Sequence, residues 1–308
     1  MRVLQLATRS SRLALWQTNA VASQLTRLGN HCEIIPVNST GDIDLVKPIY
    51  ELGVQGVFTK ELDIALLSHQ ANVAVHSLKD VPIVLAKGLK LAAVLERADY
   101  HDVLITKNGL PVEGKPFTLA TSSIRRKAQW LERYPHHRIE NVRGNVETRI
   151  KKLLESDWDG LLMAKAAIDR LELKVENVHP LDWMLPAPGQ GAVAIVCRED
   201  DDEVMAQLSK INHPPTFMNV TAERMFLHEL KGGCSAPISS LVKTKNGSLH
   251  FEGAVHSLDG KRKIIVTKTF AEADFEHAGR VCAEEVIAST EGASILKEIF
   301  AAKPEMKL

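Results

Sequence analysis

Over roughly the first two hundred residues, short apolar runs with β-strand character alternate with amphipathic stretches of helical period. The run at 3–7 precedes a helix-type pattern at 13–28, and a second helix-type pattern at 58–69 precedes the run at 73–76. Parallel strands need a long crossover between them, and this crossover is usually a helix. The alternation therefore predicts α/β units with largely parallel sheets.

The alternation restarts after residue 95, and a Pro/Gly-rich stretch at 186–191 is typical of a hinge or crossing between two such units. In this region we expect strands at 89–95, 103–106, 117–120, 160–164 and 192–197, and helices at 124–134 and 146–154.

From about residue 214 the order changes, because strands and helices are grouped rather than alternating. Such grouping is typical of an α+β domain. The expected elements are a helix at 221–230, strands at 238–243, 249–256 and 263–270, and helices at 275–288 and 293–300. Three domains are predicted, with bounds 1–94 plus 190–213, 95–189, and 214–308.

The composition is that of an ordinary folded protein, with 45% hydrophobic and 25% charged residues in a chain of 308. The 38 Lys and Arg residues equal the 38 Asp and Glu residues, so the overall charge favours neither nucleic acid nor a membrane as a partner. The sequence opens without a secretory signal and contains no run of about 18 apolar residues. We expect a cytoplasmic monomer.

Metal binding has no support in the sequence. The four cysteines are far apart, and His136 and His137 are adjacent and therefore face different ways. We interpret both histidines as surface residues and predict no metal site. The scattered cysteines, Cys32, Cys197, Cys234 and Cys282, suit a reducing compartment better than a disulfide framework.

Cys234 follows two glycines in the run Lys231-Gly232-Gly233-Cys234-Ser235-Ala236-Pro237. Glycine removes the Cβ obstacle, so a tight turn here is able to hold one thiol toward a cleft. The segment predicts a covalent attachment point, and a buried cysteine within a turn is an equal alternative at this stage.

Asp80 lies just past the predicted strand at 73–76, in Ser77-Leu78-Lys79-Asp80-Val81-Pro82. Open α/β sheets place their ligands at the carboxyl ends of strands. Pro82 disfavours helix at the preceding residue, so we expect a loop. The alternative is a solvated Lys79–Asp80 pair.

Arginines recur beside hydroxyl or glycine residues at three predicted strand-to-helix junctions. These junctions are 8–12, 121–127 and 143–149. Cations in the first turn of a helix oppose its macrodipole, and a bound anion removes that conflict. The three junctions predict a cationic cleft for a ligand with many carboxylates or phosphates. The sequence contains neither a Gly-x-x-x-x-Gly-Lys-Ser/Thr loop nor a Gly-x-Gly-x-x-Gly turn after a strand, so nucleotide binding is not supported.

Six motifs, in the same order along nearly the whole chain, resemble the porphobilinogen deaminase (hydroxymethylbilane synthase) family. They are Ala7-Thr8-Arg9-Ser10-Ser11-Arg12-Leu13-Ala14, Val75-His76-Ser77-Leu78-Lys79-Asp80-Val81-Pro82, Thr121-Ser122-Ser123-Ile124-Arg125-Arg126, Val142-Arg143-Gly144-Asn145-Val146-Glu147-Thr148-Arg149, Pro188-Gly189-Gln190-Gly191-Ala192, and Gly232-Gly233-Cys234-Ser235-Ala236-Pro237-Ile238.

The resemblance implies three domains, of which the first two are similar to type II periplasmic-binding-protein domains with a cleft between them, and the third is a small α+β domain with an antiparallel sheet. It implies a transferase of tetrapyrrole and haem biosynthesis. Four porphobilinogen molecules are joined head to tail, with loss of ammonia, on a dipyrromethane cofactor bound through a thioether to Cys234. Hydrolysis then releases hydroxymethylbilane.

The resemblance also implies roles for individual residues. Asp80 would be the catalytic carboxylate, in keeping with the stabilisation that a fixed anion gives to cationic pyrroles. Cofactor carboxylates would be held by Lys79, Thr121, Ser122, Ser123, Arg125 and Arg126. Substrate or the growing chain would be held by Arg9, Ser11, Gln17, Ser77, Arg143, Gly144, Arg149 and Gln190. Phe58 and Lys60 would lie in a loop near the cleft.

Two segments depart from the family pattern. Gly53-Val54-Gln55-Gly56 stands where the family commonly has Gly-Gly-Lys-Gly. Lys165 lies in a segment expected to be more apolar, and two interpretations stay open for it: a new charge near the cofactor, or a solvated side chain. Two other functions stay open: a small-molecule binding protein on the same scaffold, with no use for Cys234, and a thiol enzyme in which His228 or His256 activates Cys234.

Overall fold

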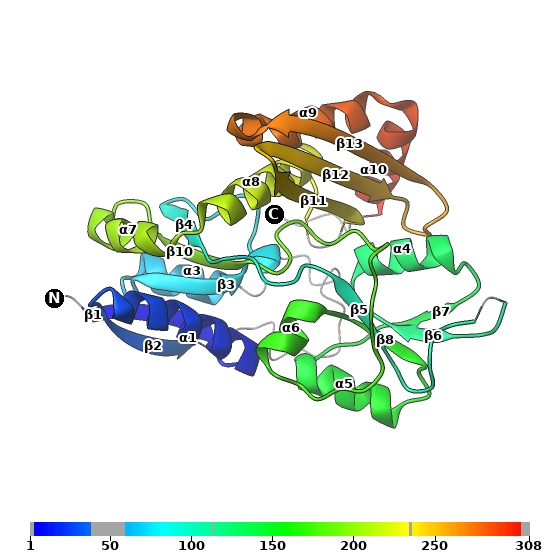
Figure 1. The fold of residues 1–308 in the computed structure, drawn as a ribbon, viewed down its shortest axis with the longest axis horizontal. Helices are drawn as coiled ribbons and strands as arrows, with labels where there is room; N and C mark the ends of the chain where they lie inside the picture. Colours follow the sequence, from blue (N-terminus) through cyan, green and yellow to red (C-terminus); the bar gives the residue numbers. More distant parts are fainter. Residues whose placement is uncertain (1–2, 38–58, 113, 234–235, 303–308) are drawn as a thin grey trace.

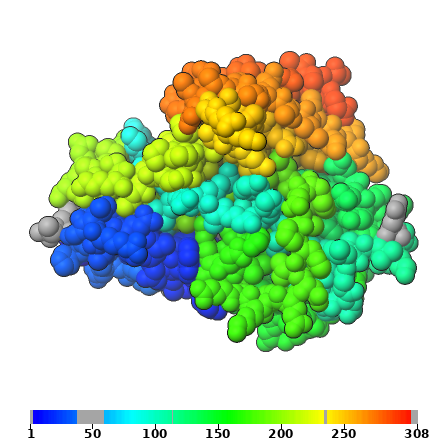
Figure 2. Space-filling view, in the orientation of Figure 1, coloured from blue at the N-terminus to red at the C-terminus, as the bar shows by residue number. Residues whose placement is uncertain are grey.

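The computed structural model describes residues 3–37, 59–112, 114–233 and 236–302. Three units are visible in Figure 1: a first lobe in blue and cyan, a second lobe in green, and a third unit in yellow to red. The space-filling view shows the third unit lying over the other two (Figure 2).

The first lobe is built on a five-stranded sheet of order β2-β1-β3-β10-β4. Its strands are β1 (Val3–Arg9), β2 (His31–Val37), β3 (Val73–Ser77), β4 (Leu89–Val94) and β10 (Val193–Arg198), and its helices are α1 (Arg12–Arg27), α3 (Lys60–Leu67) and α7 (Asp202–Leu208). Apolar side chains alternate along the strands, so that Val75 packs with Val21 of α1 and Ala74 packs with Leu62 of α3. Both faces of the sheet are therefore covered.

The second lobe repeats this plan with a sheet of order β7-β6-β8-β5-β9. Its strands are β5 (Asp102–Thr106), β6 (Thr118–Ala120), β7 (Arg138–Glu140), β8 (Gly160–Ala164) and β9 (Val178–Pro180), and its helices are α4 (Ile124–Arg133), α5 (Val146–Glu155) and α6 (Lys165–Arg170).

The expectation of largely parallel sheets is only half right. In the first lobe β1 pairs with β2 and β3 in parallel, whereas β10 is antiparallel to both its neighbours. In the second lobe β6 pairs with β7 and β8 in parallel, whereas β5 is antiparallel to β8 and β9. Strands β5 and β10 are the ones that follow the two connectors between the lobes. Their direction was not predictable, because an apolar run does not indicate the direction in which its strand enters a sheet.

The third unit confirms the expected α+β arrangement. Its antiparallel sheet has the order β11-β12-β13, from Ile238–Lys245, Ser248–His256 and Lys263–Ala271. Its helices are α8 (Pro214–Glu229), α9 (Phe275–Ala288) and α10 (Thr290–Ala301). Helix α8 begins seven residues before the predicted start at 221, because His213 accepts a hydrogen bond from the Thr216 N–H and a proline follows it at the first helical position.

Two connectors, around residues 95–101 and 181–192, join the lobes and touch each other. At Gly191, φ is +87°, and an added Cβ would lie 2.7 Å from the carbonyl oxygen of Ala98. Only glycine allows the connectors to approach this closely.

Glu223 of α8 holds both connectors against the third unit. Its carboxylate accepts hydrogen bonds from Arg97 Nη1 (2.6 Å) and Nη2 (3.1 Å), from the Gly189 N–H (2.8 Å) and from the Val242 N–H (2.8 Å). The Glu223 side chain is fully buried. One buried carboxylate therefore links both connectors to the third unit.

Candidate active site

Asp80 lies at the carboxyl end of β3, as its position in the sequence predicted. The segment Leu78–Asp80 is a 3-10 turn rather than the expected loop, and Leu78 anchors it in the core. From the third unit, Arg224 donates to the carbonyl oxygens of Val81 (3.0 Å) and Pro82 (2.7 Å). The turn that carries the half-exposed Asp80 is therefore fixed from both sides.

The junction at 121–126 forms the amino end of α4. Ser123 caps the helix by accepting from the Arg126 N–H, Thr121 Oγ1 accepts from the Ser123 N–H (3.2 Å), and Ser122 Oγ donates to the Val142 carbonyl. All three hydroxyls therefore bond to the protein's own backbone. Ser123 is the helix cap, whereas the bonds of Thr121 and Ser122 fix the loop that leads into the helix, so that all three help to orient the two arginines that follow.

Arg125 and Arg126 are buried and share one carboxylate, that of Asp102 at the start of β5. Arg125 Nη1 lies 2.7 Å from Asp102 Oδ2, and Arg126 Nη2 lies 2.7 Å from Asp102 Oδ1. Burial by itself would raise the pKa of Asp102, but the two guanidinium groups hold it well below its usual range. The protein thus supplies one counter-ion for the cationic helix start.

Lys79 joins the same group of charges through Gln190. Lys79 Nζ donates to Gln190 Oε1 (3.2 Å), and Gln190 Nε2 donates to Asp102 Oδ1 (3.0 Å). Burial, and then the neighbouring Arg126, lower the pKa of Lys79 to about 8. An anion at this position would restore its usual basicity.

The junction at 143–149 forms the amino end of α5. Asn145 caps the helix by accepting from the Thr148 N–H (2.8 Å), and Gly144 has a φ of +122°. Arg149 Nε donates to the Gly144 carbonyl (2.7 Å). Burial, and then the charges of Arg126 and Arg143, lower the pKa of Arg149 to about 10.

Charges from all three junctions act on Arg149, because Arg9 also lowers its pKa and Asp80 raises it. The structure therefore brings the junctions together, as the sequence predicted. Six cationic side chains and two carboxylates, Asp80 and Asp102, are thus linked by their mutual electrostatic effects; the cations are Arg9, Lys79, Arg125, Arg126, Arg143 and Arg149.

The remaining candidates at the first lobe lie on α1 and β3. Ser11 caps α1 by accepting from the Ala14 N–H (3.4 Å). Gln17 Nε2 donates to Ser77 Oγ (2.8 Å), which ties α1 to the end of β3 beside Asp80. Lys60 is exposed and begins α3.

Cys234, Phe58 and Gln55 lie outside the described residues. Beside Cys234, the Ala236 N–H donates to the Gly233 carbonyl (3.0 Å), and an added Cβ at Gly232 would meet Leu227 Cδ1 at 2.3 Å. Gly232 therefore packs closely against α8, and a larger residue would need the Leu227 side chain to move.

The chain matches two protein-family models: "Porphobilinogen deaminase, dipyromethane cofactor binding domain" over residues 4–206, and "Porphobilinogen deaminase, C-terminal domain" over residues 217–288. It is also 42% identical over 304 residues to a porphobilinogen deaminase of Syntrophomonas wolfei, covering 97% of this chain and 99% of the relative. The chain belongs to the porphobilinogen deaminase family. Membership confirms the expected transferase activity and the expected dipyrromethane cofactor.

Similar solved structures include the periplasmic VFT2 domain of BvgS from Bordetella pertussis, which is 17% identical with a TM-score of 0.41 and covers 68% of this chain and 86% of that chain. They also include the putative periplasmic sulfonate-binding protein SsuA from Methylobacillus flagellatus, 14% identical with a TM-score of 0.38, covering 73% of this chain and 67% of that chain. The fold assignment rests on the strand orders given above.

The residues of the cleft fit the family's polycarboxylate cofactor. Arg125 Nε is buried and has no hydrogen-bond partner among the described residues. A buried N–H without an acceptor is costly, and a carboxylate is the acceptor that guanidinium groups prefer. By contrast, the described residues hold no group of three or more His, Cys, Asp or Glu side chains able to bind a metal ion.

Sequence reasoning missed Asp102, Glu223, Arg97 and Arg224. Each acts on a residue distant in the chain, so no local pattern marks it. The only signal is a charge within an otherwise apolar run, as at Asp102 beside the strand that begins at 103 and at Glu223 within α8.

The structure also shows the surroundings of the adjacent histidines and of Lys165. His137 is buried rather than exposed: it stacks on Tyr134 at 4.7 Å between ring centroids and accepts from Trp130 Nε1 (3.2 Å), whereas His136 is exposed as predicted. Lys165 pairs with Asp169 (2.7 Å) one turn along α6 at the surface, which favours its interpretation as a solvated charge.

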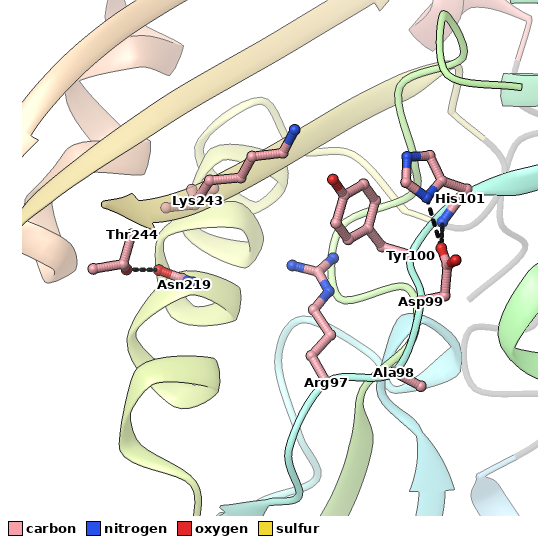
Figure 3. Close-up of a pocket in the computed structure, with 9 residues that line it drawn as sticks. Arg97, Ala98, Asp99, Tyr100, His101, Asn219, Lys243 and Thr244 are labelled. Atoms are coloured by element: carbon pink, nitrogen blue, oxygen red, sulfur yellow. Dashed lines mark hydrogen bonds and ion pairs between the residues drawn. The ribbon is translucent and has the colours of Figure 1, made fainter. Parts of the chain in front are cut away.

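A cavity of about 500 Å³, lined by none of the arginines of the three junctions, lies between the first connector and the third unit (Figure 3). In this cavity Arg97 Cζ and Lys243 Nζ each lie 5.4 Å from the centroid of the Tyr100 ring. Within the residues described, no helix is both long and apolar enough to cross a membrane.

Proposed function

We propose that the cleft lined by the three arginine junctions is where this chain joins four porphobilinogen molecules into hydroxymethylbilane. The observation that carries this proposal is that four arginines from the three junctions lie close enough to Lys79 or Arg149 to lower their pKa values, and that the Asp80 carboxylate acts on both of these cations. Each pyrrole of substrate and product bears two carboxylates, so a growing chain needs many cations and one carboxylate facing its reacting carbon.

Asp80 is the proposed catalytic residue. Loss of ammonia from porphobilinogen leaves a cationic pyrrole, and a fixed carboxylate lowers its energy. Asp80 also accepts the pyrrole N–H and assists proton transfer. Its support by Arg224 and Leu78 favours this role, because an anion that is already oriented pays no cost of reorganisation during the reaction.

The cofactor is proposed to be attached to Cys234, and when bound it supplies the pyrrole carbon to which the first substrate is joined. Its carboxylates are assigned to the buried group at the amino end of α4, where Arg125 Nε needs an acceptor. The assigned residues are Lys79, Thr121, Ser122, Ser123, Arg125 and Arg126. Because the three hydroxyls already bond to the backbone, they contribute mainly by shaping the helix start.

Incoming porphobilinogen and the growing chain are assigned to the more open part of the cleft. The assigned residues are Arg9, Ser11, Gln17, Ser77, Arg143, Gly144, Arg149 and Gln190, with Phe58 and Lys60 in the adjoining loop. In this assignment Gln17 and Gln190 position Ser77 and Lys79 through their hydrogen bonds.

We further propose domain bounds of 1–94 plus 190–213, 95–189 and 214–308, in agreement with the membership of the three sheets. A cytoplasmic monomer is also proposed, because the scattered cysteines suit a reducing compartment and the numbers of acidic and basic residues are equal.

Incubation of the purified full chain with porphobilinogen tests the function. We expect release of ammonia and formation of hydroxymethylbilane, and an intact mass that includes two pyrroles and loses them in Cys234→Ser. Asp80→Asn should keep the adduct and lose turnover, whereas Asp169→Asn, at an exposed ion pair, should keep both. A chain that binds porphobilinogen without releasing ammonia would be a binding protein instead.

A further inference from the structure

The carboxylate of Asp102 is more completely engaged than an ordinary buried ion pair requires. Oδ1 accepts hydrogen bonds from Arg126 Nε (2.8 Å) and Gln190 Nε2 (3.0 Å) and forms an ion pair with Arg126 Nη2 (2.7 Å), and Oδ2 accepts from Arg125 Nη1 (2.7 Å). The side chain is fully buried. These four contacts come from α4 and from the second connector, so Asp102 joins two elements of the cleft.

Arg125 and Arg126 differ in which of their nitrogen atoms have a hydrogen-bond acceptor. Arg126 places Nε and Nη2 against Asp102 Oδ1 and donates from Nη1 to the Leu162 carbonyl (3.1 Å), so each of its three nitrogens has a contact with the protein. Arg125 uses Nη1 on both Asp102 and the Leu185 carbonyl (2.9 Å), while its buried Nε has no partner among the described residues. Two acceptors on one nitrogen fix the guanidinium plane and direct Nε elsewhere.

The charges explain why a carboxylate is needed here. Arg125 and Arg126 are buried and Lys79 is partly buried beside them, and a buried cation without a counter-ion is strongly destabilising. Asp102 is the one carboxylate in hydrogen-bond contact with these arginines among the residues that the structure describes. It makes a folded, ligand-free cleft possible while leaving the cluster with excess positive charge for a ligand.

We propose that Asp102 is a positioning residue for cofactor loading, which holds Arg125 with its Nε ready for a cofactor carboxylate and links this group to Lys79 through Gln190. The inference rests on the proposed cofactor role of Arg125. In the cofactor-free protein Asp102 is the counter-ion of Arg125, Arg126 and Lys79. In the loaded protein the carboxylates of the cofactor also balance these charges.

The proposal makes two predictions for Asp102→Asn. An asparagine of the same shape is uncharged and has one acceptor oxygen, so it cannot hold both arginines. Loading of the two-pyrrole group should be about tenfold to hundredfold slower, as expected for loss of a charge-assisted hydrogen bond. The melting temperature of the apoprotein should fall more than that of the loaded protein.

The apoprotein is made by cell-free translation without porphobilinogen, and loading is followed by intact mass after porphobilinogen is added. The matched control is Asp201→Asn, which breaks a buried pair with Arg198 (2.7 Å) in the first lobe, remote from the cleft. It should lower the melting temperatures of apo and loaded protein equally and leave the loading rate unchanged.

A double variant, Asp102→Asn with Arg125→Gln, tests whether Asp102 acts through Arg125. Loading by the double variant should be little slower than by Arg125→Gln alone, because the two residues act as one unit. Fully multiplicative losses, or an Asp102→Asn variant that loads at the wild-type rate, would overturn the proposal.

If Asp102→Asn fails to fold in both forms, Gln190→Met provides the test, since it leaves the arginines paired and removes the link to Lys79. Slower loading at an unchanged melting temperature of the loaded protein supports the proposal, and wild-type loading refutes it. A wild-type chain that never gains two pyrroles would instead refute the proposed function.

Discussion

Replacement of Glu223 by glutamine should loosen the attachment of the third unit to both connectors. The carboxylate is fully buried, and the Arg97 side chain with which it pairs is 10% exposed. Glutamine keeps one acceptor oxygen but loses the charge, so Arg97 becomes a buried cation without its counter-ion. Breaking a buried pair in this way costs about 3–5 kcal/mol.

This cost is large enough to measure. With an unfolding entropy of about 2 cal/mol/K per residue, a loss of about 3–5 kcal/mol lowers the melting temperature of a 308-residue chain that unfolds as one unit by roughly 5–8 °C. Differential scanning calorimetry gives the melting temperature. Hydrogen exchange adds a local readout, since the backbone N–H of Gly189 should exchange faster when its acceptor Glu223 is altered.

The same substitution at Glu285 provides the control. Glu285 pairs with Lys268 (2.7 Å) at the surface of the same unit and is 52% exposed. Exposed pairs contribute about 0–1 kcal/mol, so Glu285→Gln should change the melting temperature by less than about 2 °C. If Glu223→Gln melts within that same margin of the wild type, the connectors are held by packing alone and the reasoning is wrong.

Four further predictions concern the cleft. Asp80→Asn should remain folded and lose about two to three orders of magnitude in the rate of product formation, as expected for removal of a preorganised charge. Arg143→Ala should fold and accumulate partly elongated chains on the enzyme, visible by intact mass; normal turnover would contradict its assignment. Gly144→Ala should lower stability by about 1–3 kcal/mol in a thermal melt, because φ is +122° and the new Cβ would lie 2.7 Å from Thr148 Cγ2. The pKa of Lys79 is lowered to about 8, so its ammonium is charged below that pH and neutral above it; cofactor loading should weaken as pH rises through 8, and Lys79→Met should remove this dependence.

Local features of the site were predictable because neighbours in the sequence produce them. Ser11 and Ser123 cap their helices, and hydroxyl residues before an amphipathic run are a direct sign of a cap. The βα pattern then implied that the junctions meet at the carboxyl ends of strands, and the influence of Arg9 and Arg126 on Arg149 confirms that they do. The family motifs gave the chemistry.

The sequence alone determined the three-part architecture, the positions of the strand-to-helix junctions and the family to which the chain belongs. Only the tertiary structure decided the antiparallel direction of β5 and β10, the burial of His137, and the pairing of the buried carboxylates of Asp102 and Glu223 with arginines. Asp102 meets Arg125 across 23 positions and Glu223 meets Arg97 across 126. These pairs form only when the connectors bring the lobes and the third unit together. The hydrophobic periodicity of a sequence indicates which face of a helix or strand is buried, but it does not indicate which residues that face contacts.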